Sequence, residues 1–158
     1  MKSALRYLIF LTLPLYVADQ VTKWLVLQNI GTNDVVQLIP GVLDFVHVHN
    51  TGAAFGMLKD SNAFFVLLAV TALVVVGVLA WKGAFAGTPT RIAAALLVSG
   101  ILGNLTDRLL HGHVVDFLDV ILPWYGHWPA FNIADSCICV AAGLFILDGL
   151  VSGKSPRR

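Results

Sequence analysis

The sequence predicts an all-α integral membrane protein with four transmembrane helices and a small β-sheet element outside the membrane. Hydrophobic residues make up 58% of its 158 residues and charged residues only 12%, about half the charged share of a typical soluble domain. The mean hydropathy is +0.82. Four long apolar windows alternate with polar connections, which is the pattern expected of a protein that crosses a bilayer several times.

The four windows account for most of the chain. A spanning helix needs about 20 mainly apolar residues, and we place the four spans at residues 5–27, 63–81, 92–110 and 131–151. The first window resembles a signal peptide, but it is too long and lacks a small-residue cleavage site, so we predict that it is retained. No separate soluble domain fits beside these spans. We therefore expect a single four-span domain over residues 1–158.

Positive charge is divided unevenly between the two sides of this predicted membrane domain. The chain ends and the connection after the second span carry seven of the ten lysines and arginines, namely Lys2, Arg6, Lys82, Arg91, Lys154, Arg157 and Arg158. The positive-inside rule places this side in the cytoplasm. The two longer connections, residues 28–62 and 111–130, then face outward.

The outer connections carry strand and interface signals. Residues 34–39 and 42–49 are rich in β-branched and aromatic side chains and flank a Pro-Gly turn, which predicts a small hairpin-like sheet lying on the membrane. The second outer connection has a cluster of large aromatic residues: Trp124, Tyr125 and Trp128. Such residues are typical of the headgroup level, so we expect an interfacial loop there.

Two aspartates, Asp116 and Asp135, lie at the edges of the third and fourth apolar stretches. A carboxylate close to the hydrocarbon is costly, which makes it a functional-site hypothesis by default. Brought together on the outer face, the two could form a dyad that shares one proton. Asp116 is flanked by apolar side chains, where desolvation should raise its pKa. Taken alone, Asn132-x-x-Asp135 is more typical of a helix capping box, and this alternative stays open.

The other polar residues of the spans also gather in their outer halves. Asp19 and Lys23 are spaced i, i+4 and can pair on one helix face. That pair could simply make both residues tolerable in the membrane, or it could orient substrate. Asn104, Asp107 and Arg108 share a face of the third span by their spacing. We therefore expect one polar site that faces outward.

Other chemistries have weaker support in the sequence. The outer segments hold five histidines (His47, His49, His111, His113 and His127), but their spacing matches no zinc motif, and we expect no metal and no cofactor. No Gly-x-Ser-x-Gly element is present. With a net charge of +1 and no basic stripe, nucleic acid is excluded as a partner. A proton- or ion-coupled transporter is the main alternative, although it should carry polar residues near the membrane midplane.

Five motifs, in order along the chain, resemble the bacterial lipoprotein signal peptidase family, also called signal peptidase II. They are DQVTK at 19–23, NTGAAF at 50–55, GILGNLTDR at 100–108, VVDF at 114–117 and FNIAD at 131–135. The resemblance implies an aspartic endopeptidase that needs no cofactor. It would cleave signal peptides from prolipoproteins, N-terminal to a diacylglyceryl-modified cysteine, using water activated by an aspartate dyad.

The resemblance also implies roles for individual residues and a location. Asp116 and Asp135 match the family's catalytic pair. Eight further residues match positions that bind substrate or shape the site: Asn50, Gly52, Asn104, Arg108, Asn132, Ala134, Asp19 and Lys23. The resemblance further implies an interfacial lid-like helix, membrane lipids as partners and sensitivity to globomycin-type inhibitors. It places the protein in the bacterial cytoplasmic (inner) membrane with its site on the periplasmic side.

Overall fold

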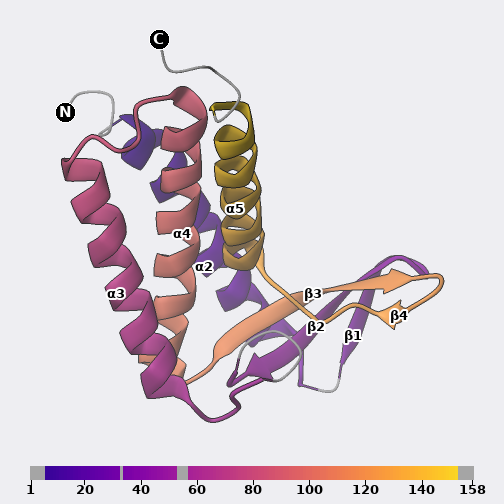
Figure 1. Ribbon diagram of the computed structural model, residues 1–158. Coiled ribbons are helices and arrows are strands. Elements are labelled where there is room, and N and C mark those ends of the chain that lie inside the picture. Colours follow the sequence, from indigo (N-terminus) through magenta and orange to yellow (C-terminus); the bar gives the residue numbers. More distant parts are fainter. Residues whose placement is uncertain (1–5, 33, 53–56, 153–158) are drawn as a thin grey trace.

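The computed structural model describes residues 6–32, 34–52 and 57–152 (Figure 1). Its helical elements are a π-helical stretch η1 (Leu8–Thr12), α2 (Leu13–Asn29), α3 (Asn62–Trp81), α4 (Thr88–His111) and α5 (Ile133–Ser152). Its strands are β1 (Val35–Ile39), β2 (Leu43–Asn50), β3 (Val114–Leu122) and β4 (Gly126–His127). The helices form a bundle, and the sheet lies beyond one end of it (Figure 1).

The predicted helices are confirmed, with bounds that differ by a few residues. Three described helices, α3, α4 and α5, are long and apolar enough to cross a membrane, with hydropathies of 2.9, 1.3 and 1.9. The first predicted span is helical from Arg6 to Asn29, because η1 leads directly into α2. Pro14 lies in the first turn of α2. Proline has no backbone N–H, so it cannot donate the hydrogen bond that a helix makes to the preceding turn. The wider π-helical turn accommodates its ring.

Helix α4 is the centre of the bundle. In its apolar window 61% of the residues are buried, against 6% in α3. Close contact with α5 depends on small residues, since a Cβ added at Gly100 would overlap the carbonyl of Ala134. A Cβ added at Gly103 would lie 2.6 Å from a carboxylate oxygen of Asp19 and 2.9 Å from the Cβ of Ala134. These glycines therefore bring α2, α4 and α5 close together.

The sheet is antiparallel, with strand order β1-β2-β3-β4. The predicted hairpin is confirmed: β1 and β2 are joined by a turn in which Gly41 has φ 72°. The second outer connection differs from the expected interfacial loop or helix, because its described residues supply β3 and the short β4 instead. The apolar, β-branched run of β3 pairs with the free edge of β2. Two exposed aromatic residues of this connection, Trp124 and Tyr125, lie in the turn after β3.

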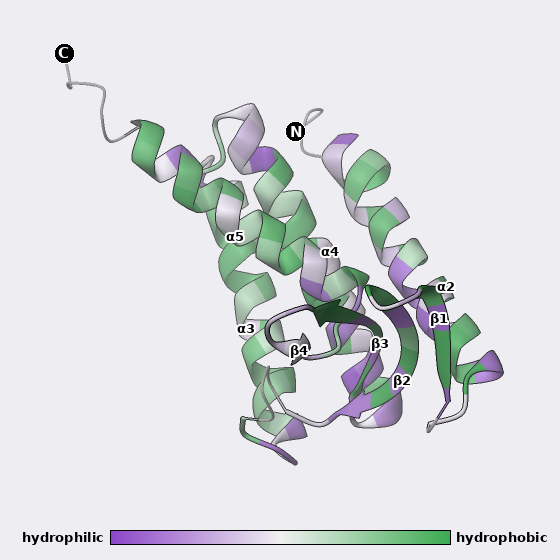
Figure 2. Cartoon of the chain, turned by 90° about the vertical axis from the view of Figure 1, so that its right-hand side faces the viewer, coloured by the Kyte–Doolittle hydropathy of each residue, from purple (hydrophilic) through white to green (hydrophobic). Residues whose placement is uncertain are grey.

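The sheet is held against the bundle by an apolar cluster at the end of α2. Val26 and Ile30 pack on Val115 and Phe117 of β3, and all four side chains are buried. The start of the helical stretch η1, the end of α5 and the α3–α4 connection lie at the opposite end of the bundle (Figure 1). The helices are coloured mainly hydrophobic between these two ends (Figure 2). This arrangement places β3 directly beside the first turn of α5.

Candidate active site

Asp116 and Asp135 come together where β3 meets the start of α5. Asp116 is 1% exposed, and Asp135 lies in the first turn of α5. One residue between them, Asn132, contacts both carboxylates. Its Nδ2 donates to Oδ1 of Asp116 at 2.7 Å, and its backbone N–H donates to Oδ2 of Asp135 at 3.3 Å. The two aspartates predicted as a pair therefore share an immediate neighbour.

The predicted capping box is also present. The backbone N–H of Asp135 donates to Oδ1 of Asn132 at 2.8 Å, which completes the reciprocal pair of hydrogen bonds. The cap occupies one oxygen of the Asp135 carboxylate. Its other oxygen accepts a 2.7 Å hydrogen bond from Nδ2 of Asn104. Capping and membership of the aspartate pair are thus compatible, because the helix start fixes the position of the carboxylate.

The carboxyl group of Asp116 is held in an environment that favours its neutral form. Burial, reinforced by the negative charge of Asp135, raises the pKa of Asp116 to about 7. Hydrogen bonds from Asn50 and Asn132 and the charge of Lys23 act in the opposite direction. The Asn50 hydrogen bond, from Nδ2 to Oδ2 of Asp116, is 2.9 Å long. A proton on Asp116 is therefore available near neutral pH.

A buried ion cluster lies behind the aspartate pair. Nζ of Lys23 is 2.8 Å from Oδ2 of Asp19 and 2.9 Å from Oδ2 of Asp107, so the predicted Asp19–Lys23 pair is confirmed. The same ammonium donates to Oδ1 of Asn104 at 3.1 Å. Asp19 also accepts a 2.8 Å hydrogen bond from the backbone N–H of Ala134. The cluster therefore ties α2 and α4 to the first turn of α5.

Asp107 and Arg108 are adjacent in sequence but have different partners. Asp107 accepts from the backbone N–H of Val115 at 3.0 Å as well as pairing with the lysine. Nη2 of Arg108 donates to the carbonyl of Gly52 at 2.7 Å, and its guanidinium lies 4.3 Å from the ring centroid of Phe65. Gly52 in turn donates its N–H to Oδ1 of Asn50 at 3.0 Å. Arg108 thus fixes the chain beside the aspartate pair, although residues 53–55 of that motif lie outside the described residues.

This arrangement can supply proton transfer and water activation. Within the described ranges, no group of three or more histidine, cysteine or acidic residues is arranged to hold a metal ion. His47 and His49 contact each other through their Nε2 atoms at 3.0 Å. Two carboxyl groups that share a neighbour and are surrounded by amide donors can supply one acid and one base.

Comparison with known proteins agrees with this geometry. The family model for signal peptidase (SPase) II matches residues 11–151. The chain belongs to the signal peptidase II family. It is therefore an aspartic peptidase, a hydrolase built on transmembrane helices.

Relatives of this peptidase include a lipoprotein signal peptidase of Shewanella pealeana, which is 44% identical over 148 residues, 90% of this chain and 85% of the relative. A lipoprotein signal peptidase of Neisseria meningitidis serogroup C is 42% identical over 165 residues, 99% of this chain and 96% of the relative. A solved bacterial membrane enzyme, determined by the in meso method at 2.3 Å resolution, superposes with a TM-score of 0.87 at 31% identity. The superposition covers 100% of this chain and 94% of the chain of that enzyme.

Sequence reasoning overlooked one polar residue of this signal peptidase's site. Nε2 of Gln20 lies 3.2 Å from oxygens of Asp19 and Asp107 and from the carbonyl of Gly103. The available signal was a second polar side chain next to Asp19 in the outer half of an apolar span. Asp119, three residues after Asp116, lies apart from the pair and contacts Nδ1 of His127 at 2.6 Å.

Proposed function

We propose that this peptidase cleaves signal peptides from prolipoproteins, on the N-terminal side of a diacylglyceryl-modified cysteine, with Asp116 and Asp135 as its catalytic pair. The supporting observation is the shared contact of Asn132 with both carboxyl groups. The names of the relatives, lipoprotein signal peptidases, support the substrate class.

The proposed reaction uses one proton on the pair. Asp135, at the start of α5 where the helix dipole favours an anion, accepts a proton from the attacking water. Asp116, with its pKa of about 7, gives its proton to the carbonyl oxygen as the water oxygen bonds to the carbonyl carbon. When the tetrahedral intermediate collapses, Asp135 protonates the leaving nitrogen and a hydroxyl proton returns to Asp116. The C–N bond breaks, and both carboxyl groups regain their starting states.

The surrounding residues act by positioning. Three amides orient the carboxyl groups, since Asn50 and Asn132 donate to Asp116 and Asn104 donates to Asp135. In this proposal Gly52 and Arg108 shape the substrate-binding segment. Asp19 and Lys23 hold the first turn of α5 in place, through the N–H of Ala134.

The proposed location is the bacterial cytoplasmic (inner) membrane, with the aspartate pair on the periplasmic side. The arginine- and lysine-bearing end of the bundle is opposite the sheet (Figure 1), which by the positive-inside rule leaves the sheet outside. Exposed apolar side chains on β1, including Val35 and Ile39, suit a sheet that rests on lipid. A lipid-bearing substrate could then enter from the membrane while its scissile bond meets water. Globomycin-type inhibitors would compete at the same site.

The test compares two precursors of one lipoprotein, with and without the diacylglyceryl group on the cysteine. The purified wild-type protein should cleave the lipidated precursor, and globomycin should block this cleavage. The unlipidated precursor should be cleaved far more slowly, and the double variant Asp116→Asn/Asp135→Asn serves as the blank. Equal cleavage of both precursors would overturn the substrate assignment, whereas cleavage by the double variant would overturn the catalytic one.

A further inference from the structure

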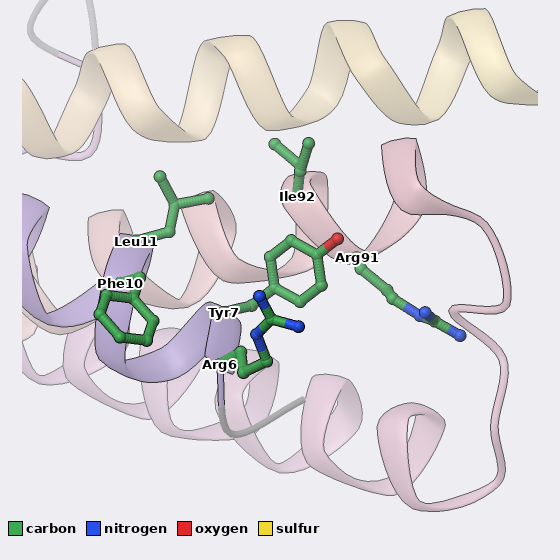
Figure 3. A pocket seen from close by; sticks show the side chains of 6 residues that line it. All are labelled: Arg6, Tyr7, Phe10, Leu11, Arg91 and Ile92. Carbon is green, nitrogen blue, oxygen red and sulfur yellow. The ribbon is translucent and has the colours of Figure 1, made fainter. Parts of the chain in front are cut away.

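Two pockets open at the end of the bundle opposite the aspartate pair. The first has a volume of about 610 Å³ and is lined by Arg6, Tyr7, Phe10, Leu11, Arg91 and Ile92 (Figure 3). The second, of about 590 Å³, has a mainly apolar lining that includes Leu73, Val76, Gly77, Ala80 and Val98. Both pockets are also lined by Tyr7 and Arg91. They are therefore neighbours, one with a charged rim and the other apolar.

The arginines of the first pocket carry uncompensated positive charge. Within the described parts of the chain, neither Arg6 nor Arg91 forms an ion pair with a carboxylate. Arg91 donates through Nε to the carbonyl of Phe85 at 3.0 Å, a contact that leaves its terminal nitrogens available. In Figure 3, the side chain of Arg91 extends away from Arg6, whose guanidinium lies beside the ring of Tyr7. Its hydroxyl adds a hydrogen-bond donor that suits a phosphate oxygen.

We propose that the two pockets together bind one phospholipid with a net negative headgroup. The phosphate lies at Arg6, because a guanidinium group matches phosphate oxygens in geometry and charge, and Arg91 adds positive charge at the same pocket. An acyl chain occupies the apolar pocket beside Gly77. Basic pockets between transmembrane helices at the cytoplasmic side are suited to anionic lipids, and both volumes lie in the range of about 300–1,000 Å³ expected of a ligand site.

This lipid site is separate from the proposed substrate site in position and in chemistry. Asp116 is on β3 and Asp135 is in the first turn of α5, whereas η1 and the start of α4 lie at the other end of the helices (Figure 1). A soluble anion could use the arginines but not the apolar pocket. A zwitterionic lipid could use the apolar pocket, but its own cation would oppose the arginines. The combination selects an anionic phospholipid.

The chain offers matched variants for each half of the site. Arg6→Gln and Arg91→Gln remove the charges, and Lys82→Gln removes a charge from the same end of the bundle without lining either pocket. A Cβ added at Gly77 meets no atom within 4 Å, so Gly77→Leu can fill the apolar pocket without disturbing α3. Gly149 is similarly open, but it lies on α5 away from both pockets, and Gly149→Leu is its control.

The experiment measures lipid binding to the delipidated, purified full-length protein by native mass spectrometry. Phosphatidylglycerol, phosphatidylcholine and soluble glycerol phosphate are the three probes. We expect wild type to prefer phosphatidylglycerol and to bind no glycerol phosphate. Each arginine variant should weaken phosphatidylglycerol binding about fivefold, and Gly77→Leu should also weaken it, while Lys82→Gln and Gly149→Leu match wild type. Thermal unfolding followed by circular dichroism identifies any variant that fails to fold.

Each outcome decides part of the proposal. Equal binding of phosphatidylglycerol and phosphatidylcholine, or wild-type binding by Arg6→Gln and Arg91→Gln, would overturn the anionic headgroup. Wild-type binding by Gly77→Leu would overturn the position of the acyl chain. Binding of glycerol phosphate alone would show an anion site that does not require lipid. If Arg91→Gln fails to fold because its contact with Phe85 is lost, Arg6→Gln and Gly77→Leu still decide the result.

Discussion

Two pairs of aspartates lie at the end of the bundle next to the sheet, and they are stabilised in different ways. Asp19 and Asp107 each contact the ammonium of Lys23, at 2.8 and 2.9 Å. Among the described residues, the side-chain and backbone groups that donate hydrogen bonds to Asp116 and Asp135 are all amides. A cation therefore contacts both carboxylates of the first pair. In the described part of the chain no cation contacts the second pair, and burial raises the pKa of Asp116.

Asn104 connects the two pairs. It accepts a hydrogen bond from Lys23 at 3.1 Å and donates one to Asp135 at 2.7 Å. The lysine charge therefore acts on the second pair at a distance, and it lowers the pKa of Asp116 against the larger effect of burial. A single buried cation thus contacts one pair of carboxylates directly, while it acts on the neighbouring pair only through Asn104 and at a distance.

The largest expected effect comes from neutralising the second pair. Asp116→Asn and Asp135→Asn should each lower kcat by about 10³-fold or more, because each removes a proton-transfer group. Asparagine has the shape of aspartate, so both variants should keep wild-type helix content and melting behaviour. The measurement is cleavage of a lipidated precursor together with circular dichroism.

Asp119→Asn is the matched control for these two variants. Asp119 also lies on β3 but contacts His127, so this variant should retain near-normal turnover. Near-normal turnover in either Asp116→Asn or Asp135→Asn would contradict the proposal that these two aspartates are the catalytic pair.

A smaller but still large effect is expected from removing the cation of the first pair. Lys23→Met leaves Asp19 and Asp107 buried without a counter-charge, which should cost about 3–5 kcal/mol of unfolding free energy. Neutralising both acids as well, in the triple variant with Asp19→Asn and Asp107→Asn, should recover part of that loss. Unfolding in mixed micelles of increasing denaturing detergent measures these free energies.

The control for the lysine variant is Lys59→Met, because Lys59 is exposed. Its unfolding free energy should stay within about 0.5 kcal/mol of wild type, as for most surface substitutions. An equally small change in Lys23→Met would mean that Asp19 and Asp107 do not depend on the lysine, and that the two pairs are not neutralised differently.

The sequence predicted the helices, the Asp116–Asp135 pair and the Asp19–Lys23 ion pair, because their residues have local signals, but it did not predict the contact of Asp107 with Lys23. A spanning helix can be recognised from about 20 mainly apolar residues. A carboxylate within such a stretch stands out, because placing it near the hydrocarbon costs free energy. The strand β3 was not predicted, since its run of β-branched residues becomes a strand only by pairing with β2, more than 60 residues earlier. Gln20 was missed for a similar reason: two of its partners, Gly103 and Asp107, belong to another helix.

The smallest expected effect is a shift in pH dependence that reports directly on the second pair. Because the pKa of Asp116 is raised to about 7, the folded protein binds more protons than the unfolded chain between about pH 4 and 7. The contribution of this group to stability therefore falls as the pH rises through that window. Activity should follow the same proton, so kcat/KM should decline above about pH 7 as Asp116 ionises.

Asn50→Ala sharpens this last prediction, because the Asn50 hydrogen bond lowers the pKa of Asp116. Its loss should move the alkaline limb of the kcat/KM profile to higher pH, in addition to any weaker handling of substrate. Asn29→Ala, at an exposed asparagine whose side chain bonds the carbonyl of Leu25, should leave the profile unchanged. A shift to lower pH in Asn50→Ala would mean that the proton lost on the alkaline side is not the one on Asp116. The proposed contrast between cation-paired and proton-sharing aspartates would then need another explanation.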